Sequence, residues 1–333
     1  MTRVVSSTDY HTGGEPFRIV TAGVPVPQGA TVAERRRWSI QHLDDVRAML
    51  CREPRGHADM YGCFVTPPDD VDGHLGTVFF HNDGFSTACG HGTIALATWA
   101  IDTGLITPGP DDTEVEVVID VPSGRVRAIA ALDDGRATSV RFRNVPALVH
   151  SMDVELDVDG RTVTVDVAYG GAFYASLEAN QVGLEVVPER ASELIAVGRA
   201  IKHAANAALD LRLPDDSGDV GLYGTILYDR LGDGHQRNIA VFADGQVDRS
   251  PCGSGTSARL AVLAERGELA IGDTLVHDSI VGTRFLGRLL GEAPPRGSTR
   301  RWDTEVEGKA SRTGQHTFVL DPDDELGLGF VIR

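Results

Sequence analysis

The sequence predicts a mixed α/β protein made of two similar halves, each with a buried helix at its centre. Its 333 residues exceed a typical single core and suit two domains of ordinary size. Short β-branched segments alternate with glycine, proline and aspartate, a pattern typical of strands separated by turns. One short motif also occurs twice, about half the chain apart. Together these features favour a duplicated architecture.

The predicted strands and outer helices follow from residue type and periodicity. Five β-branched segments are predicted to be strands: Phe17–Val24, Thr77–Phe80, Val115–Val121, Arg125–Ala130 and Ser139–Phe142. Two longer segments, Ala30–Leu50 and Pro188–Leu209, combine good helix formers with polar faces. We expect these two helices to lie on the outside of a sheet.

Two further predicted helices have almost no polar face. They are Thr93–Ile101 and Ala258–Ala264. A helix that is apolar nearly all round must be buried on most sides. We therefore expect one of them at the centre of each half.

The same motif precedes both central helices. Cys89–Ala95 and Cys252–Ala258 are identical at five of seven positions, with an offset of 163 residues. Identity in such unusual residues, at an offset of half the chain, indicates an internal structural repeat.

Charge and composition exclude several classes of partner. The formal charge of −17 and a pI near 5.0 repel phosphate backbones and anionic lipid, so nucleic acid and membrane surfaces are not expected partners. The N-terminus lacks the apolar segment of a signal peptide, and no stretch approaches the ~20 apolar residues of a membrane span. We expect a cytoplasmic protein.

Cofactor and metal sites are not expected either. Only two lysines, Lys202 and Lys309, could form a Schiff base with pyridoxal phosphate. His91 has no partner at metal-ligand spacing, and we interpret Cys51 and Cys63 as packing residues. Four cysteines are too few for a disulfide scaffold, and in a reducing compartment an unusual cysteine is more often catalytic or metal-bound.

The repeated motif places a thiol and two glycines where a buried helix begins. The first backbone N–H groups of a helix have no intrahelical partner and favour negative charge. Such a position stabilises a thiolate or binds a carboxylate, and glycine lets a ligand approach the backbone closely. One such position could be a carboxylate pocket, an anion site or a reactive thiol.

Two such positions suggest a more specific chemistry. If the two thiols flank one carbon, one removes a proton from one face and the other returns a proton to the opposite face. General acid and base catalysis then requires one thiolate and one thiol, whose titrations are coupled. Amides at both helix ends would stabilise the negative charge that grows on a substrate carboxylate.

Five segments carry a likeness to one known family: Asp9–Pro16, Glu53–Gly62, Cys89–Ile94, Tyr169–Ala175 and Asp248–Ala258. On these segments the chain resembles the proline racemase family of racemases, hydroxyproline epimerases and trans-3-hydroxyproline dehydratases. It implies a diaminopimelate epimerase-like fold with two pseudo-symmetric domains, each a sheet wrapped around a central helix. We expect these domains at residues 1–135, completed by 325–333, and at 136–324.

The resemblance also implies roles for individual residues and a cofactor-independent reaction. Cys89 and Cys252 match the catalytic pair, and Asp248 matches the acid that pairs with the ring nitrogen of a small cyclic amino acid. The remaining matches concern substrate binding: Gly90, His91, Gly253 and Ser254 through backbone amides, and Tyr61 and Phe242 through aromatic rings. Ordinary core packing is an equal interpretation for the two aromatic residues.

Several functions remain open. Cysteine at position 252 favours a racemase or epimerase of proline or a hydroxyproline, because many dehydratases carry threonine there. Glu53–Gly62, Tyr169–Ala175 and Leu222–Thr225 instead resemble the trans-3-hydroxy-L-proline dehydratase branch. An inactive amino-acid-binding protein and a thiol redox protein are alternatives of other classes. We expect a role in amino-acid catabolism and a homodimer, the commonest assembly of soluble enzymes.

Overall fold

The computed structural model describes residues 3–213 and 221–332, and the chain folds as two compact units. Unit 1 comprises Met1–Phe142 and Gly308–Arg333, and unit 2 comprises Arg143–Glu307. The first boundary therefore lies later than the predicted position 135, and the returning segment starts earlier than 325. The reason is β17 (Ala310–Leu320), which pairs with β1 (Arg3–Thr12) along its whole length and so belongs to unit 1.

Unit 1 is a sheet wrapped around one helix. Its strands pair in the order β17-β1-β2-β3-β4-β5-β6, and β7 follows β6 in the chain. Helix α3 (Gly90–Asp102) contacts β17 and β1 near one end of this order and β5 and β6 at the other. The remaining strands are β2 (Glu15–Ala22), β3 (Tyr61–Thr66), β4 (Leu75–His81), β5 (Glu114–Val121), β6 (Gly124–Asp133) and β7 (Arg136–Arg143).

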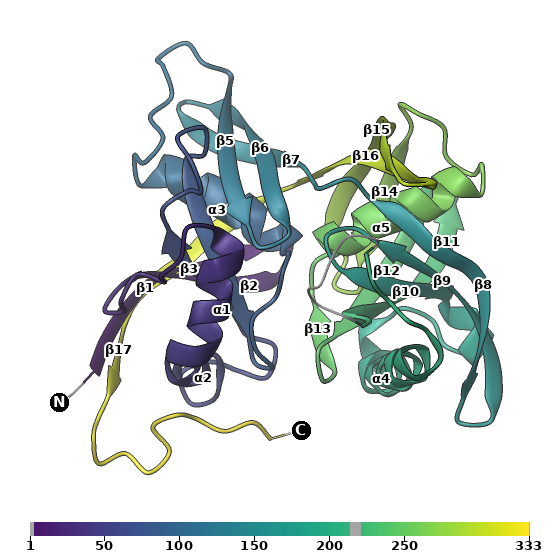
Figure 1. Cartoon of the computed structure of the whole chain (residues 1–333), viewed down its shortest axis with the longest axis horizontal. Coiled ribbons are helices and arrows are strands. Elements are labelled where there is room, and N and C mark those ends of the chain that lie inside the picture. The colour runs from purple at the N-terminus through teal and green to yellow at the C-terminus, as the bar shows by residue number, and fades with distance from the viewer. Residues whose placement is uncertain (1–2, 214–220, 333) are drawn as a thin grey trace. The chain divides into compact units, whose positions relative to one another are not determined.

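The opposite face of this sheet carries α1 (Val32–His42) and α2 (Asp44–Cys51) (Figure 1). Adjacent residues of β4 show the two faces, because side chains alternate along a strand. Phe79 packs edge-on against Phe17 on the side of α3, whereas Phe80 belongs to the core formed with α1 and α2. Every residue of β4 is consequently buried.

The single helix predicted for Ala30–Leu50 is wrong in detail. Thr31 caps α1 with a capping box, so the helix begins at Val32. The chain then leaves helical geometry at Leu43, whose backbone has φ −126° and ψ 11°. The side chain of Leu43 is buried. Asp44 and Asp45 follow in the first turn of a second helix, where negative charge is favoured.

Unit 2 has the same plan. Its strands pair in the order β8-β9-β10-β11-β12-β14-β15-β16, and β13 pairs with the end of β12. Helix α5 (Gly253–Glu265) contacts β15 near one end and β8 and β9 at the other. The strands are β8 (Leu148–Val158), β9 (Arg161–Tyr169), β10 (Phe173–Glu178), β11 (Gly224–Gly232), β12 (His235–Phe242), β13 (Gln246–Asp248), β14 (Thr274–Ser279), β15 (Arg284–Arg296) and β16 (Thr299–Gly308).

The outer helix of unit 2 is α4 (Ala191–Ala208), preceded by 3₁₀ turns at Ala179–Val182 and Pro188–Arg190. Ile226 of β11 packs in the core that contains α5 residues, whereas the next residue, Leu227, packs in the core that contains α4 residues. The predicted mixed class, with one buried central helix in each half, is therefore confirmed. In each of α3 and α5, 11 residues are buried.

Across residues 3–213 and 221–332, no helix is both long enough and apolar enough to cross a membrane.

Helix α5 is anchored to β9 through the carboxylate of Asp166. Arg266 approaches this carboxylate to 2.6 Å, and Arg259 approaches it to 3.7 Å. The side chain of Arg259 is completely buried and lies over the ring of Tyr228, with its Cζ 4.1 Å from the ring centroid. Its terminal nitrogens donate no hydrogen bond to any residue that the structure describes, so Asp166 is the charge that balances it.

This anchor predicts a non-additive pair of substitutions. Asp166→Ala should lower the free energy of unfolding by about 3–5 kcal/mol, because it leaves Arg259 as an uncompensated buried charge. Arg259→Met should be nearly neutral alone and should recover most of the loss in the double variant. Urea denaturation of the four proteins measures this cycle.

A control at the exposed pair of Asp244 and Arg199 keeps the test specific. Asp244→Ala should change stability by less than about 1 kcal/mol, because exposed ion pairs contribute little. Additive effects of Asp166→Ala and Arg259→Met would contradict the assigned anchor.

Candidate active site

Helix α3 begins immediately after Cys89, whose extended backbone (φ −155°, ψ 101°) turns its side chain over the first turn. The amide of Gly92 donates a hydrogen bond to the sulfur at 3.2 Å. Position 92 must be glycine for this approach, because a Cβ there would lie 2.5 Å from Phe17 and 2.7 Å from the sulfur. The helix end therefore favours negative charge on this thiol.

His91 lies beside the same sulfur as a neutral imidazole. The sulfur is 3.5 Å from both ring nitrogens. Burial lowers the pKa of His91 to about 3, so the ring is uncharged at neutral pH. Thr12 fixes the first turn by donating to the carbonyl of His91 at 2.9 Å.

Tyr61 completes this group of unit 1 residues, which we call the Cys89 cluster: Tyr61, Ser86, Cys89, Gly90, His91 and Gly92. The ring of Tyr61 meets the imidazole of His91 edge-on, with 4.9 Å between centroids. Its hydroxyl forms a hydrogen bond with Ser86. Ser86 carried no recognisable signal in the sequence.

Helix α5 begins after Cys252, which has a different conformation from Cys89. Its φ of +64° lies in the left-handed region, which is uncommon for a residue with a Cβ and costs about 1–3 kcal/mol. Ser250 supports this conformation by accepting the amide hydrogen bond of Cys252 at 3.1 Å. The hydroxyl of Ser250 in turn donates to Asp248 at 2.6 Å.

Two hydroxyl groups lie close to the sulfur of Cys252. The hydroxyl of Tyr174 is 3.7 Å from it and that of Ser254 is 4.0 Å from it. The two hydroxyls are hydrogen-bonded to each other at 2.7 Å. With Tyr223, Phe242, Asp248, Ser250 and Gly253 these residues form what we call the Cys252 cluster.

The aromatic residues of the Cys252 cluster are in contact with one another. Tyr223 stacks on Phe242 at 5.5 Å and meets Tyr174 edge-on at 5.7 Å. Tyr174 and Tyr223 lie in segments that resemble the dehydratase branch, yet neither was among the predicted site residues. A tyrosine in a buried strand looks like ordinary core from sequence alone.

Burial shifts the titration of this cluster. Burial raises the pKa of Asp248 to about 6, and the hydrogen bonds from Ser250 oppose the rise. Burial, followed by the negative charge of Asp248, raises the pKa of the Cys252 thiol. Burial likewise raises the pKa of Tyr174 well above its ordinary value. At neutral pH, Cys252 and Tyr174 therefore both carry their protons.

All the predicted site residues thus belong to one of two clusters. Cys89, Gly90, His91 and Tyr61 are together in unit 1. Cys252, Gly253, Ser254, Asp248 and Phe242 are together in unit 2. Each cluster presents a buried thiol at the start of a buried helix, which is an arrangement suited to proton transfer.

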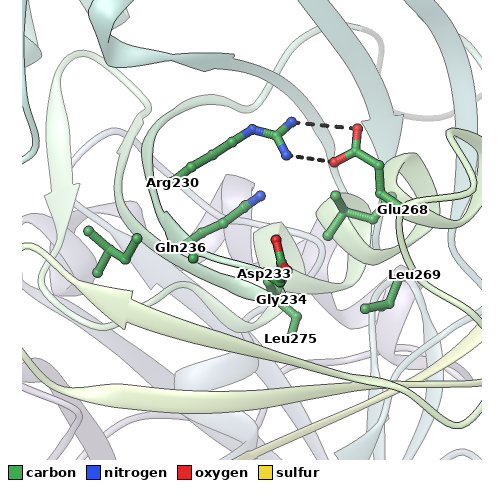
Figure 2. A pocket seen from close by; sticks show the side chains of 10 residues that line it. Arg230, Asp233, Gly234, Gln236, Glu268, Leu269 and Leu275 are labelled. Atoms are coloured by element: carbon green, nitrogen blue, oxygen red, sulfur yellow. Dashed lines mark hydrogen bonds and ion pairs between the residues drawn. The ribbon is translucent and has the colours of Figure 1, made fainter.

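A separate cavity of about 530 Å³ lies in unit 2 near the other end of α5 (Figure 2). Arg230 and Glu268 pair across it at 2.7 Å, and Leu263, Leu269 and Leu275 supply its apolar lining. None of the predicted site residues lines it. Within the described parts of the chain, no group of three or more His, Cys, Asp or Glu residues is arranged to hold a metal ion.

The raised pKa of Asp248 predicts a pH-dependent stability difference. The folded protein binds this proton more tightly than the unfolded chain, so the contribution of Asp248 to stability falls as pH rises from about 4 to about 6. Asp248→Asn removes this titration and should gain up to about 3 kcal/mol relative to the parent over that window. Urea denaturation of both proteins at several pH values measures the difference.

Asp233→Asn, at an exposed carboxylate of the β11–β12 turn, is the control, because it makes the same chemical change outside the buried cluster. A stability difference between Asp248→Asn and the parent that is constant with pH would contradict the raised pKa.

Proteins of known name are similar to this chain over its whole length. A trans-3-hydroxy-L-proline dehydratase of Bacillus thuringiensis is 41% identical over 340 residues, covering 100% of this chain and 99% of the relative. A 3-hydroxyproline 2-epimerase of Burkholderia multivorans is 44% identical over 336 residues, covering 100% and 99%.

A solved structure of a hydroxyproline epimerase from Agrobacterium vitis, with bound trans-4-hydroxy-L-proline, superimposes with a TM-score of 0.92. It is 31% identical and covers 99% of this chain and 95% of its own. This likeness confirms the fold class that the resemblance implied. The sequence pattern of the family described as "Proline racemase" matches residues 7–331, and the chain belongs to the proline racemase family.

Proposed function

We propose that this chain is a cofactor-independent 2-epimerase of 3-hydroxyproline, with Cys89 and Cys252 as its acid and base. The observation that carries the proposal is a thiol at the start of both buried helices. The relatives from Bacillus thuringiensis and Burkholderia multivorans are both named for 3-hydroxyproline, which supports that substrate.

The different surroundings of the two thiols suggest their resting states. The Gly92 amide favours negative charge on Cys89, whereas burial and Asp248 keep Cys252 protonated. In the proposed reaction the Cys89 thiolate takes the α-proton, and the C–H electron pair stays on Cα and spreads into the carboxylate. The Cys252 thiol then gives its proton to the opposite face of Cα. The reverse reaction exchanges the two roles.

Amides and a carboxylate would hold the substrate during this transfer. The first amides of α3 and α5, at Gly90, His91, Gly253 and Ser254, are suited to the substrate carboxylate, because helix N-termini bind anions. Asp248 is suited to the ring ammonium group. Neutralisation of Asp248 by that ammonium would weaken the charge that opposes a Cys252 thiolate.

Dehydration is the second candidate, because the relative from Bacillus thuringiensis is named a dehydratase. After a thiolate takes the α-proton, the electron pair left on Cα would form a Cα=Cβ double bond, and the β-hydroxyl would leave as water by taking the proton back from that thiol. This outcome needs only one base at Cα, so it does not explain a second cysteine.

We also propose that the enzyme acts in the cytoplasm, in amino-acid catabolism, as a homodimer. The four cysteines are all buried and form no disulfide with one another, as expected in a reducing compartment.

NMR in deuterium oxide distinguishes the candidates. With trans-3-hydroxy-L-proline, epimerisation should yield cis-3-hydroxy-D-proline with deuterium at Cα, whereas dehydration should remove the β-hydroxyl. Proline and trans-4-hydroxy-L-proline test the substrate. Cys89→Ser and Cys252→Ser should each lower the rate of inversion about 10²- to 10⁴-fold, as expected for loss of an acid or a base.

Cys63→Ser is the matched control and should retain activity. Cys63 lies in β3, where the neighbouring Thr77 hydroxyl can bond with the new serine. Inversion by Cys252→Ser at the parent rate would overturn the two-thiol proposal. Loss of the β-hydroxyl without any epimer would favour the dehydratase.

A further inference from the structure

The hydroxyl of Tyr174 is placed to act on Cys252. Tyr174 lies on β10 between its register partners Ala168 on β9 and Gly224 on β11, so it stands inside the sheet and not at its edge. Its side chain is buried, and its hydroxyl bonds to Ser254 at 2.7 Å and lies 3.7 Å from the Cys252 sulfur. Two elements distant in sequence thus bring a hydroxyl pair to one thiol.

The groups around the Cys252 sulfur fall into two opposing sets. Burial and the negative charge of Asp248 disfavour the thiolate. The amide of Gly255 favours the thiolate by donating a hydrogen bond to the sulfur. The hydroxyl of Tyr174 accepts from the protonated thiol, and it can donate to the sulfur once the thiol has lost its proton, while Ser254 donates to Tyr174. Beyond these neighbours, Tyr223 faces Tyr174, and Arg249 acts on Asp248. The hydroxyl pair is therefore the main neutral support for negative charge on this sulfur.

Cys89 is supported differently. Its sulfur accepts the amide of Gly92 and lies beside the imidazole of His91. A change at Tyr174 should therefore affect Cys252 and leave Cys89 unaltered.

We propose that Tyr174, oriented by Ser254, is a positioning residue that enables the Cys252 thiol to release its proton. Tyr174 acts through Cys252 and does not itself react. A buried tyrosine whose pKa is well above its ordinary value keeps its proton, so it can donate a hydrogen bond to the sulfur when the thiol becomes a thiolate.

One consequence concerns the outcome of the reaction, and it rests on the proposed function. Proton removal by Cys89 does not need Tyr174, whereas proton return by Cys252 does, because Cys252 must become a thiolate as it donates. Loss of the hydrogen bond from Tyr174 to Cys252 should therefore slow inversion and lengthen the life of the carbanion. The share of carbanion that loses its β-hydroxyl would then rise.

The first experiment needs no substrate. Parent and Tyr174→Phe proteins are alkylated with iodoacetamide between pH 7 and 9.5, and modification of each cysteine is followed by peptide mass spectrometry. Alkylation of Cys252 in Tyr174→Phe should be about tenfold slower at a given pH, because the thiolate loses a charged hydrogen bond. Its rate profile should be displaced upward by about one pH unit.

Internal and matched controls accompany this measurement. The rate at Cys89 should be unchanged, and Cys51 and Cys63, both fully buried, should stay unmodified. Tyr228→Phe removes a buried tyrosine hydroxyl from β11 at the position paired with Glu178, four residues beyond the partner of Tyr174. It should leave both reactive cysteines at the parent rate.

A parent rate for Cys252 in a folded Tyr174→Phe protein overturns the proposal, and so does an equal slowing at Cys89 and Cys252. Circular dichroism and the thermal midpoint establish folding. If Tyr174→Phe does not fold, Ser254→Ala carries the test, with slower alkylation of Cys252 alone expected.

The second experiment follows turnover by NMR in deuterium oxide. Tyr174→Phe should lower kcat for inversion about tenfold with little change in KM, and the ratio of hydroxyl loss to inversion should rise. A fall in hydroxyl loss greater than the fall in inversion would instead make Tyr174 the donor to the leaving group and overturn the proposal. If the parent inverts no 3-hydroxyproline, the proposed function fails while the alkylation result still decides the role of Tyr174.

Discussion

Complete burial of a helix restricts polar chemistry to the place where the helix begins. The sides of α3 and α5 are packed against strands, and their residues are almost all apolar or small. Their first amides are the exception, because no residue within the helix can accept their hydrogen bonds. A thiol at that position meets backbone dipoles within a dry interior, where each interaction is stronger than in water. Both clusters depend on this arrangement.

The two clusters share a motif but differ in chemistry, because different residues surround the two sulfurs. In unit 1 the sulfur receives a backbone amide and lies beside a neutral imidazole. In unit 2 it lies near a carboxylate and two hydroxyls. The protein therefore surrounds the same thiol with different partners in its two units.

The sequence predicted correctly the features that depend on a local pattern. It missed features that depend on contacts between residues distant in the sequence. The apolar segments after Cys89 and Cys252 correctly placed two buried helices. The break at Leu43 was missed because a buried leucine fits a continuous helix equally well. The returning strand was placed too late because Ala310–Leu320 carries many exposed polar residues, and its pairing with β1 is not visible locally. Tyr174 was missed because only the packing of β10 against α5 brings its hydroxyl to the sulfur.

The left-handed backbone at Cys252 limits what can replace this residue. Cysteine has one heavy atom on Cβ, whereas threonine has two, a methyl and a hydroxyl. Branching at Cβ makes φ near +60° much less favourable, so threonine fits this position poorly. A threonine at this position would therefore require a different local backbone. Exchanging Cys252 for threonine is consequently a matter of rebuilding the turn from Asp248 to Cys252, including the hydrogen bonds of Ser250, and a change of one side chain is not enough.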